Sequence, residues 1–341
     1  MGDNNKPKKN LVQRFQRWVV AAIGVGALTF LGGSIWAGFD QMKEQIYGFT
    51  WWLAVPIILL TLLNYFLRFL KWHYLIGRLG ANMPFWEDAW NFTAGLAMVI
   101  SPGKAGEVLK PYVVRVRTGT PMARTIPALV TERLTDGISL MMLAGISVTT
   151  YAGDKVHYLT IPAILIAGGL AVLASKRVSL TVLGWMGKLP LMGRIVHKLE
   201  EMYLAMRVCV APVPLLITVA MSFVAWAAEC LGYYLVFQGL GVDAPMDICI
   251  FLYAFATIAG GAMPGGLGVS EGALAAGSLA LIPALGEAEA VAAMLLVRIA
   301  TLWLGVGLGA IALFKVSSSL GGLALPNEED NGEAPTEATP A

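Results

Sequence analysis

The chain has 341 residues, of which 57% are hydrophobic and 13% charged, whereas roughly 25% of the residues in soluble globular proteins are charged. This composition excludes a soluble globular protein and indicates an integral membrane protein. Several apolar runs reach the roughly 20 residues that a helix needs to cross a ~30 Å hydrocarbon core. The sequence therefore predicts membrane helices rather than the short alternating strands of a barrel. The net charge of +2 indicates little about a membrane protein, for which the positions of the charges along the chain matter more.

We expect an all-α polytopic membrane domain over residues 18–315. A basic cytoplasmic segment, 1–17, precedes it, and an acidic, disordered cytoplasmic tail, 316–341, follows. The first apolar run resembles a signal peptide but lacks a small-residue cleavage site, so we expect an uncleaved span. About six full transmembrane helices are predicted, near residues 19–38, 50–69, 125–151, 158–175, 213–238 and 290–314.

Two further regions, about 86–118 and 246–284, each consist of two short apolar arms around a Pro-Gly break. Arms of about 12 to 14 residues are too short to cross the bilayer comfortably. We therefore expect two re-entrant helical hairpins whose turns lie inside the membrane.

Lysine and arginine gather before the first predicted span, after the second, after the first hairpin and before the fifth span. The opposite loops are mainly acidic, so the positive-inside rule places the basic side and both termini in the cytoplasm. The basic segment 178–207 also carries apolar residues, and we expect part of it to lie along the inner surface as an amphipathic helix.

The two predicted hairpins share a motif. "SPGKAGEVLKP" begins at residue 101 and "MPGGLGVSEGA" at residue 263, and both contain Pro-Gly-x-x-Gly. In each, an acid follows (Glu107 or Glu271) and the next span carries an arginine (Arg133 or Arg298). Three predicted crossings separate the hairpins, which indicates an inverted-topology repeat with a binding site near the midplane. The predicted turn residues are Pro102, Gly103 and Gly106 in the first hairpin, and Pro264, Gly265, Gly266 and Gly268 in the second.

Four stretches of the chain carry a family resemblance: "NYFLRFLKWHYLI" (64–76), "SPGKAGEVLKPYVV" (101–114), "TERLTDG" (131–137) and "AMPGGLGVSEG" (262–272). They resemble the flippase-like transmembrane domain of lysylphosphatidylglycerol synthases and its stand-alone relatives. The resemblance extends over about 15–315 and implies translocation of a membrane lipid in the bacterial cytoplasmic membrane. We find no counterpart of the aminoacyl-transferring domain of the synthases, so lipid aminoacylation is not expected.

Ionisable residues fall at membrane depth in this prediction. Insertion scales assign about 2.5–3.5 kcal/mol to each unpaired charge at the centre of a membrane helix. These residues must therefore pair, protonate or face water. They are Lys104, Glu107, Glu132, Arg133, Asp136, Glu229, Glu271 and Arg298.

The first hairpin offers a candidate phosphate site. Lys104 at the tip and Lys110 further along can hold a lipid phosphate together with the free N–H groups of a half-helix. The alternative is a structural pair between Lys104 and Glu107 that closes the turn. Arg133 can reach Asp136 three residues later, either as a structural pair or while also contacting substrate.

Other charged residues at membrane depth also have alternative roles. Arg298 can bind a headgroup or neutralise Glu271, and Glu229 can carry a proton or form a hydrogen bond between helices. Glu132 is expected to be structural, and Arg68 is expected to snorkel towards the cytoplasmic interface. The predicted substrate-binding set is Lys104, Glu107, Lys110, Arg133, Asp136, Glu271 and Arg298, with Glu107, Glu229 and Glu271 as candidates for proton coupling.

Three functions compete. The first is a flippase for an anionic phospholipid or a polyprenyl-phosphate-linked lipid, and the second is an ion-coupled transporter of a small solute. The third, an intramembrane transferase or hydrolase, ranks last because the sequence shows no paired Asp motif, no histidine acid–base couple and no metal constellation. We expect no enzymatic activity, no cofactor and no metal. The expected partners are the lipid substrate, a second copy of the chain, and a lipid-modifying enzyme or glycosyltransferase, but not nucleic acid.

Overall fold

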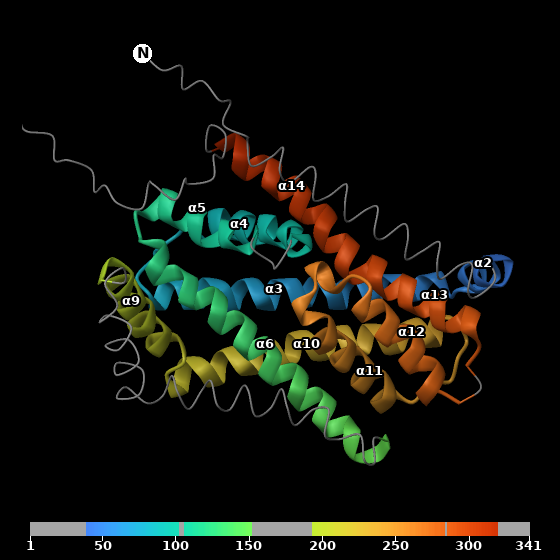
Figure 1. Ribbon diagram of the computed structural model, residues 1–341. Helices are drawn as coiled ribbons and strands as arrows, with labels where there is room; N and C mark the ends of the chain where they lie inside the picture. Colours follow the sequence, from blue (N-terminus) through green and yellow to red (C-terminus); the bar gives the residue numbers. More distant parts are fainter. Residues whose placement is uncertain (1–38, 102–105, 152–192, 284, 320–341) are drawn as a thin grey trace, which may run out of the picture.

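The computed structural model describes residues 39–101, 106–151, 193–283 and 285–319 (Figure 1). These residues form helices and turns, with no strand in the described part. The longest helical stretches are α3 (Ala54–Arg78), α6 (Met122–Tyr151), α10 (Pro212–Gly239) and a continuous run of three elements. This run consists of α13 (Glu287–Arg298), the π-helical turn η7 (Ile299–Trp303) and α14 (Leu304–Ser319). The other elements are α2 (Phe39–Gly48), η1 (Trp51–Leu53), α4 (Phe85–Ala97), η2 (Met98–Ile100), α5 (Leu109–Thr118), α9 (Gly193–Cys209), α11 (Met246–Ala259), η5 (Gly260–Ala262), η6 (Pro264–Gly266) and α12 (Val269–Leu281).

The described helices are those of a membrane protein. Within the described ranges, three helices are long and apolar enough to cross a bilayer: Trp51–Arg78, Pro212–Gly239 and Glu287–Ser319. They contain the second, fifth and sixth predicted spans, and α6 contains the third. The predicted spans 19–38 and 158–175, the segment 1–17 and most of the tail lie outside the described residues.

Helix α3 is longer than the predicted second span and ends at Arg78 rather than near residue 69. Its added turns are buried, since Trp72, Leu75 and Ile76 are fully enclosed by neighbouring helices. Arg68 is also buried, so the expectation that its side chain snorkels to the interface is wrong. The helix continues past residue 69 with Lys71 fully buried, because this lysine pairs with Asp136 inside the protein.

Helices α3 and α10 lie side by side along the molecule and provide its frame (Figure 1). The amide of Thr50, just before α3, donates to the carbonyl of Gly239 at the end of α10, with 2.8 Å between N and O. Further along, the Asn64 side-chain amide donates to the Ala225 carbonyl at 2.9 Å. The two helices therefore run antiparallel and are joined by polar contacts as well as packing.

Helices α4 and α11 end in the same way. Each passes into one turn of 3-10 helix, η2 or η5, and then into an extended residue before a proline. Ser101 has φ −74° and ψ 148°, and Met263 has φ −88° and ψ 149°. Proline disfavours helical geometry in the preceding residue, which explains why both helices stop at these positions.

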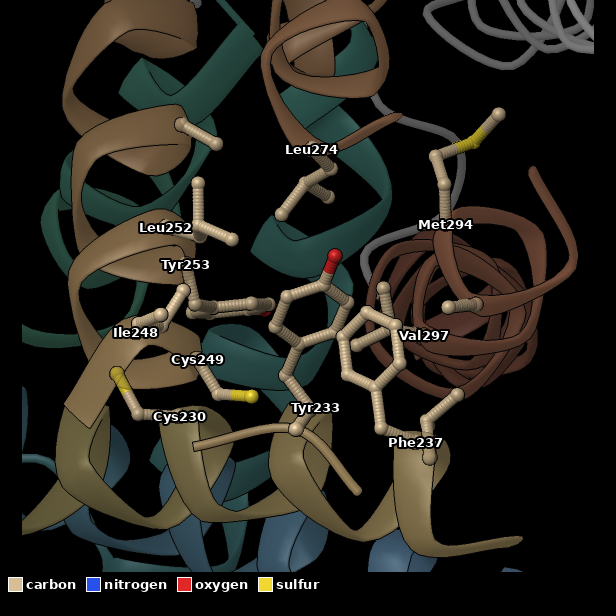
Figure 2. Close-up of a cluster of buried hydrophobic side chains, with 14 of the residues drawn as sticks. Cys230, Tyr233, Phe237, Ile248, Cys249, Leu252, Tyr253, Leu274, Met294 and Val297 are labelled. Atoms are coloured by element: carbon tan, nitrogen blue, oxygen red, sulfur yellow. The ribbon is translucent and has the colours of Figure 1, made fainter. Parts of the chain in front are cut away.

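The two helix pairs that a Pro-Gly break interrupts, α4 with α5 and α11 with α12, lie at opposite ends of α3. Helices α4 and α5 pack near its C-terminal turns, in a cluster that includes Trp72, Leu75, Phe92 and Leu109. Helices α11 and α12 belong instead to the cluster around its first turns. Figure 2 shows this second cluster, where side chains of α10, α11, α12 and α13 meet around Tyr233.

The second break lies beside the 3-10 turn η2, which precedes the first break in the chain. A Cβ atom added to Gly265 would lie 3.3 Å from Cγ2 of Ile100 in η2. Ile100 and Val306 are buried together, with Leu267 and Leu302 packed against them. The turn η2, the second break and the π-helical turn η7 thus occupy one region of the molecule.

The last helix packs closely against α4 (Figure 1). A Cβ atom at Gly309 would lie 2.8 Å from Cβ of Ala97 and 2.9 Å from the carbonyl oxygen of Thr93. Gly305, four residues earlier, is similarly close to the ring of Tyr65 on α3. This G-x-x-x-G pair therefore permits close helix contacts.

We predict that Gly309→Ala destabilises the protein by about 1–3 kcal/mol, because the added methyl group overpacks a backbone contact. The measurement is thermal unfolding of the purified protein in detergent. Gly307→Ala is the matched control, since Gly307 lies on the same helix with nothing within 4 Å of its added Cβ. Equal stability of the two variants would contradict the packing described.

Candidate functional site

A cavity of about 330 Å³ lies between the 3-10 turn η2 and the glycines of the second break. Helices α3, α6, α10, α11 and α13 contribute to its wall, together with the glycines of η5 and η6. Its polar lining includes Tyr65, Arg68, Arg133, Asp136, Trp226, Glu229, Tyr253, Ser270, Arg298 and Thr301. The predicted site residues Arg133, Asp136, Glu229 and Arg298 thus share one cavity, although they lie up to 165 residues apart in the sequence.

Arg133 forms a two-pronged ion pair with Glu107. Its Nη2 lies 2.6 Å from Oε1 of Glu107, and its Nε donates to Oε2 at 3.0 Å. The predicted contact with Asp136 is present but longer, 3.8 Å between Nη1 and Oδ2. Glu107 is buried whereas the side chain of Arg133 is 31% exposed, so this ion pair presents its basic member to the cavity.

The second half contains an equivalent ion pair. Nε of Arg298 lies 2.7 Å from Oε1 of Glu271, which confirms the predicted pairing. Its Nη2 also donates to the carbonyl of Gly265 at 2.6 Å. Arg298 therefore holds both the break and the helix that follows it. In each half, the acid after the Pro-Gly break binds the arginine of the next long helix.

The glycines of the second break have the conformations that only glycine adopts readily. Gly265, Gly266 and Gly268 have φ of 60°, 72° and 81°, in the left-handed region that side chains disfavour. In the first break, Gly106 donates its amide to Oγ of Ser101 at 2.8 Å. Pro102, Gly103 and Lys104 lie outside the described residues, so the Lys104 phosphate site stays a prediction.

Two buried lysines complete the charge network. Nζ of Lys71 lies 2.5 Å from Oδ1 of Asp136 and 2.6 Å from Oγ of Ser222. Nζ of Lys110 lies 2.6 Å from Oε2 of Glu132 and 4.5 Å from the ring centre of Trp72. Burying these charges is tolerable because each has a close partner of opposite sign.

The sequence analysis missed Lys71, and it assigned Lys110 to substrate. The structure places Lys110 against Glu132, behind the residues that line the cavity. A signal for Lys71 exists in the sequence: Thr61, Asn64, Arg68 and Lys71 recur every three or four residues, the spacing of one helix face. All four are buried.

Glu229 lies in the cavity wall without an ion-pair partner among the residues described. Its Oε2 accepts a hydrogen bond of 2.7 Å from the hydroxyl of Tyr253 on α11. The predicted hydrogen bond between helices is therefore present. The predicted role in proton coupling stays a prediction.

The structure also contains a histidine–carboxylate couple that the sequence analysis did not find. Nδ1 of His73 lies 2.8 Å from Oδ2 of Asp88, and Trp72 Nε1 donates to Oδ1 of the same carboxylate at 2.9 Å. The partners belong to consecutive helices, α3 and α4, and come together only when the connection folds back. They fix the start of α4 and do not line the cavity.

Comparison with known proteins gives the family. The family described as "Lysylphosphatidylglycerol synthase TM region" matches residues 18–309, which include every residue that lines the cavity. The chain belongs to this family. It is also similar to a "UPF0104 membrane protein" of Methanothermobacter thermautotrophicus, with 26% identity over 83% of this chain and 89% of that relative. Membership of the lysylphosphatidylglycerol synthase TM-region family indicates a function related to membrane lipids.

We predict that Glu132→Gln destabilises this family member by about 3–5 kcal/mol, because it leaves Lys110 buried without a counter-charge. Thermal unfolding in detergent measures the effect. The exposed pair of Glu87 and Arg117, with 3.6 Å between N and O, supplies the control: Glu87→Gln should change stability by under about 1 kcal/mol. Adding Lys110→Met to Glu132→Gln should recover most of the loss, and failure to do so would count against the pairing.

Proposed function

We propose that the protein is a flippase that moves an anionic phospholipid or a polyprenyl-phosphate-linked lipid between the leaflets of the cytoplasmic membrane. The observation that carries this proposal is the cavity with Arg133 and Arg298 in its wall, one arginine from each half of the chain. Membership of the lysylphosphatidylglycerol synthase TM-region family supports a lipid as the substrate.

In this proposal the two interrupted pairs are re-entrant hairpins of an inverted-topology repeat. Helices α4, α5, α11 and α12 have 13, 10, 14 and 13 residues, too few for a comfortable crossing. Their positions at opposite ends of α3 support entry from opposite faces. Such hairpins bring backbone groups to mid-membrane depth, where they are tolerated beside a polar cavity.

The ion pairs suggest how an anionic headgroup enters. Glu107 and Glu271 hold the two arginines when substrate is absent. A phosphate oxygen offers the same guanidinium groups an alternative acceptor of equal sign, so the arginines stay paired when the headgroup binds. The released carboxylates of Glu107 and Glu271 must then take up a proton or contact another cation. The acyl or prenyl chains stay in the surrounding lipid while the headgroup passes through the cavity.

An ion-coupled transporter of a small solute is the alternative, and Glu229 is the observation that favours it. A buried carboxylate with no ion-pair contact among the described residues is suited to proton exchange. This role also fits a proton-driven flippase. The two functions are therefore distinguished by whether a lipid or a soluble solute is transported. An enzymatic function is not proposed.

Reconstitution into liposomes tests the flippase. Leaflet exchange of fluorescent phosphatidylglycerol and of a polyprenyl phosphate should exceed that of protein-free liposomes. We predict that Arg133→Lys and Arg298→Lys each lower the exchange rate about tenfold or more, because lysine keeps the charge but loses the two-pronged geometry. Arg124→Lys is the control, since this half-exposed side chain lies outside the cavity wall.

The absence of leaflet exchange, while a soluble anion accumulates in the same liposomes, would overturn the flippase proposal and favour the solute transporter. Exchange at the rate of the unsubstituted protein in both arginine variants would instead overturn the role of the two arginines and show that the cavity is not on the lipid path.

The proton-coupling role of Glu229 has a separate test. We predict that Glu229→Gln abolishes the pH dependence of leaflet exchange between about pH 5 and 8, because glutamine keeps the Tyr253 hydrogen bond but cannot exchange a proton. The charged and titratable groups that share the cavity with Glu229 are Tyr65, Arg68, Arg133, Asp136, Tyr253 and Arg298. Glu287→Gln, at the exposed start of α13, is the control. A persistent pH dependence in Glu229→Gln would exclude this residue as the proton carrier.

A further inference from the structure

Arg68 is the cation left over when the buried charges are paired. Within the described residues of α3, α5 and α6, the buried Lys71 and Lys110 and the partly exposed Arg133 each form a short ion pair. The distances are 2.5 Å from Lys71 to Asp136, 2.6 Å from Lys110 to Glu132 and 2.6 Å from Arg133 to Glu107. Arg68 only approaches acids that already have such a partner. It lies 3.8 Å from Glu132 and 3.9 Å from Asp136.

The Arg68 guanidinium also has unused hydrogen-bonding capacity. Its Nε is buried and has no hydrogen-bond partner in the described part of the chain. A buried donor without an acceptor is costly. The side chain lines the cavity, so an acceptor that enters the cavity can relieve this cost.

Trp226 places a second unpaired donor beside Arg68. Its indole ring lines the same cavity, 5.5 Å from Cζ of Arg68. Its Nε1 is buried and likewise lacks a hydrogen-bond partner among the described residues. Both side chains are more than nine-tenths buried, with exposed fractions of 7% for Arg68 and 8% for Trp226.

The fold holds these two donors in place. Asn64, one turn before Arg68, binds the carbonyl of Ala225, the residue before Trp226. The nearby Lys71 binds Ser222, one turn before Trp226 on α10. These contacts set the register of α3 against α10, so the two donors are positioned before any ligand enters.

We propose that Arg68 and Trp226 form an oxyanion receptor that binds the phosphate of the lipid headgroup. Phosphate oxygens accept hydrogen bonds from the guanidinium and from the indole N–H, and their negative charge favours a site beside the Arg68 guanidinium. This inference rests on the proposed flippase function, and it assigns the first phosphate contact to residues other than Arg133 and Arg298, which have carboxylate partners.

Binding of soluble probes to the purified full-length protein in detergent tests the receptor. The probes are dihexanoylphosphatidylglycerol, inorganic phosphate and, as a phosphate-free control, dihexanoylglycerol, with affinity measured by calorimetry. We expect Arg68→Lys and Trp226→Phe each to weaken dihexanoylphosphatidylglycerol binding roughly tenfold or more, the effect of one lost hydrogen bond to a charged group. Dihexanoylglycerol should bind equally weakly to all forms.

Matched variants separate the receptor role from a structural one. Arg124→Lys and Trp52→Phe make the same chemical changes at a half-exposed and an exposed position and should leave binding unchanged. Thermal unfolding identifies any variant that fails to fold. Trp226→Phe keeps an aromatic ring next to Arg68 and decides the question if Arg68→Lys is unstable.

The outcomes distinguish the receptor from the flippase. If the protein exchanges lipid and both receptor variants bind and exchange phosphatidylglycerol normally, the receptor is wrong and the flippase stands. If no lipid is exchanged, yet phosphatidylglycerol binding depends on Arg68 and Trp226, the receptor stands and the flippase is wrong. Binding of inorganic phosphate alone, with the same dependence, would overturn the assignment to a lipid headgroup.

Discussion

The pairing of charges inside an apolar helical frame is the constraint on which the rest of the structure depends. Lys71 and Lys110 are buried in the described structure, and an isolated ion there would cost several kcal/mol. Their partners, Asp136 and Glu132, lie one turn apart on α6. Helix α6 must therefore lie where both lysines can reach it, and α3 and α5 take their positions around it. Packing of the apolar faces then completes an arrangement that these ion pairs specify.

The two halves of the chain share one local arrangement of helix end, acid and arginine. A helix ends before a proline, the chain turns, and an acid on the next segment binds an arginine further along. The two halves differ in the other contacts that their arginines make. Arg298 also binds the Gly265 carbonyl, whereas Arg133 approaches Asp136. The π-helical turn η7 follows Arg298 directly, and Tyr65 donates a hydrogen bond to the carbonyl of Thr301 within it. Such turns widen a helix and expose carbonyl groups, and they are frequent at functional sites.

Much of the helical layout was predictable because its signals are local. The arms of both interrupted segments end within a few residues of the predicted positions, since proline and glycine act on their immediate neighbours. The pair of Arg298 and Glu271 was predictable from the motif that recurs in the two halves. The end of α3 was not, because a span boundary inferred from charges assumes that charged residues face water or the interface. Arg68 and Lys71 instead face other helices, and this orientation depends on residues of α6 and α10.

The sequence by itself determined an all-helical membrane chain with two Pro-Gly breaks, each followed by an acid and an arginine. Hydrophobic length and helix interruption depend on neighbouring residues, so they can be read along the chain. Only the tertiary structure decided that Glu107 binds Arg133 and that Asp88 binds His73. It also decided that Arg68 and Trp226 line one cavity with donors that are unpaired within the described part of the chain. Which groups meet depends on the rotation and register of helices far apart in sequence, and those are set by the packing of the whole protein.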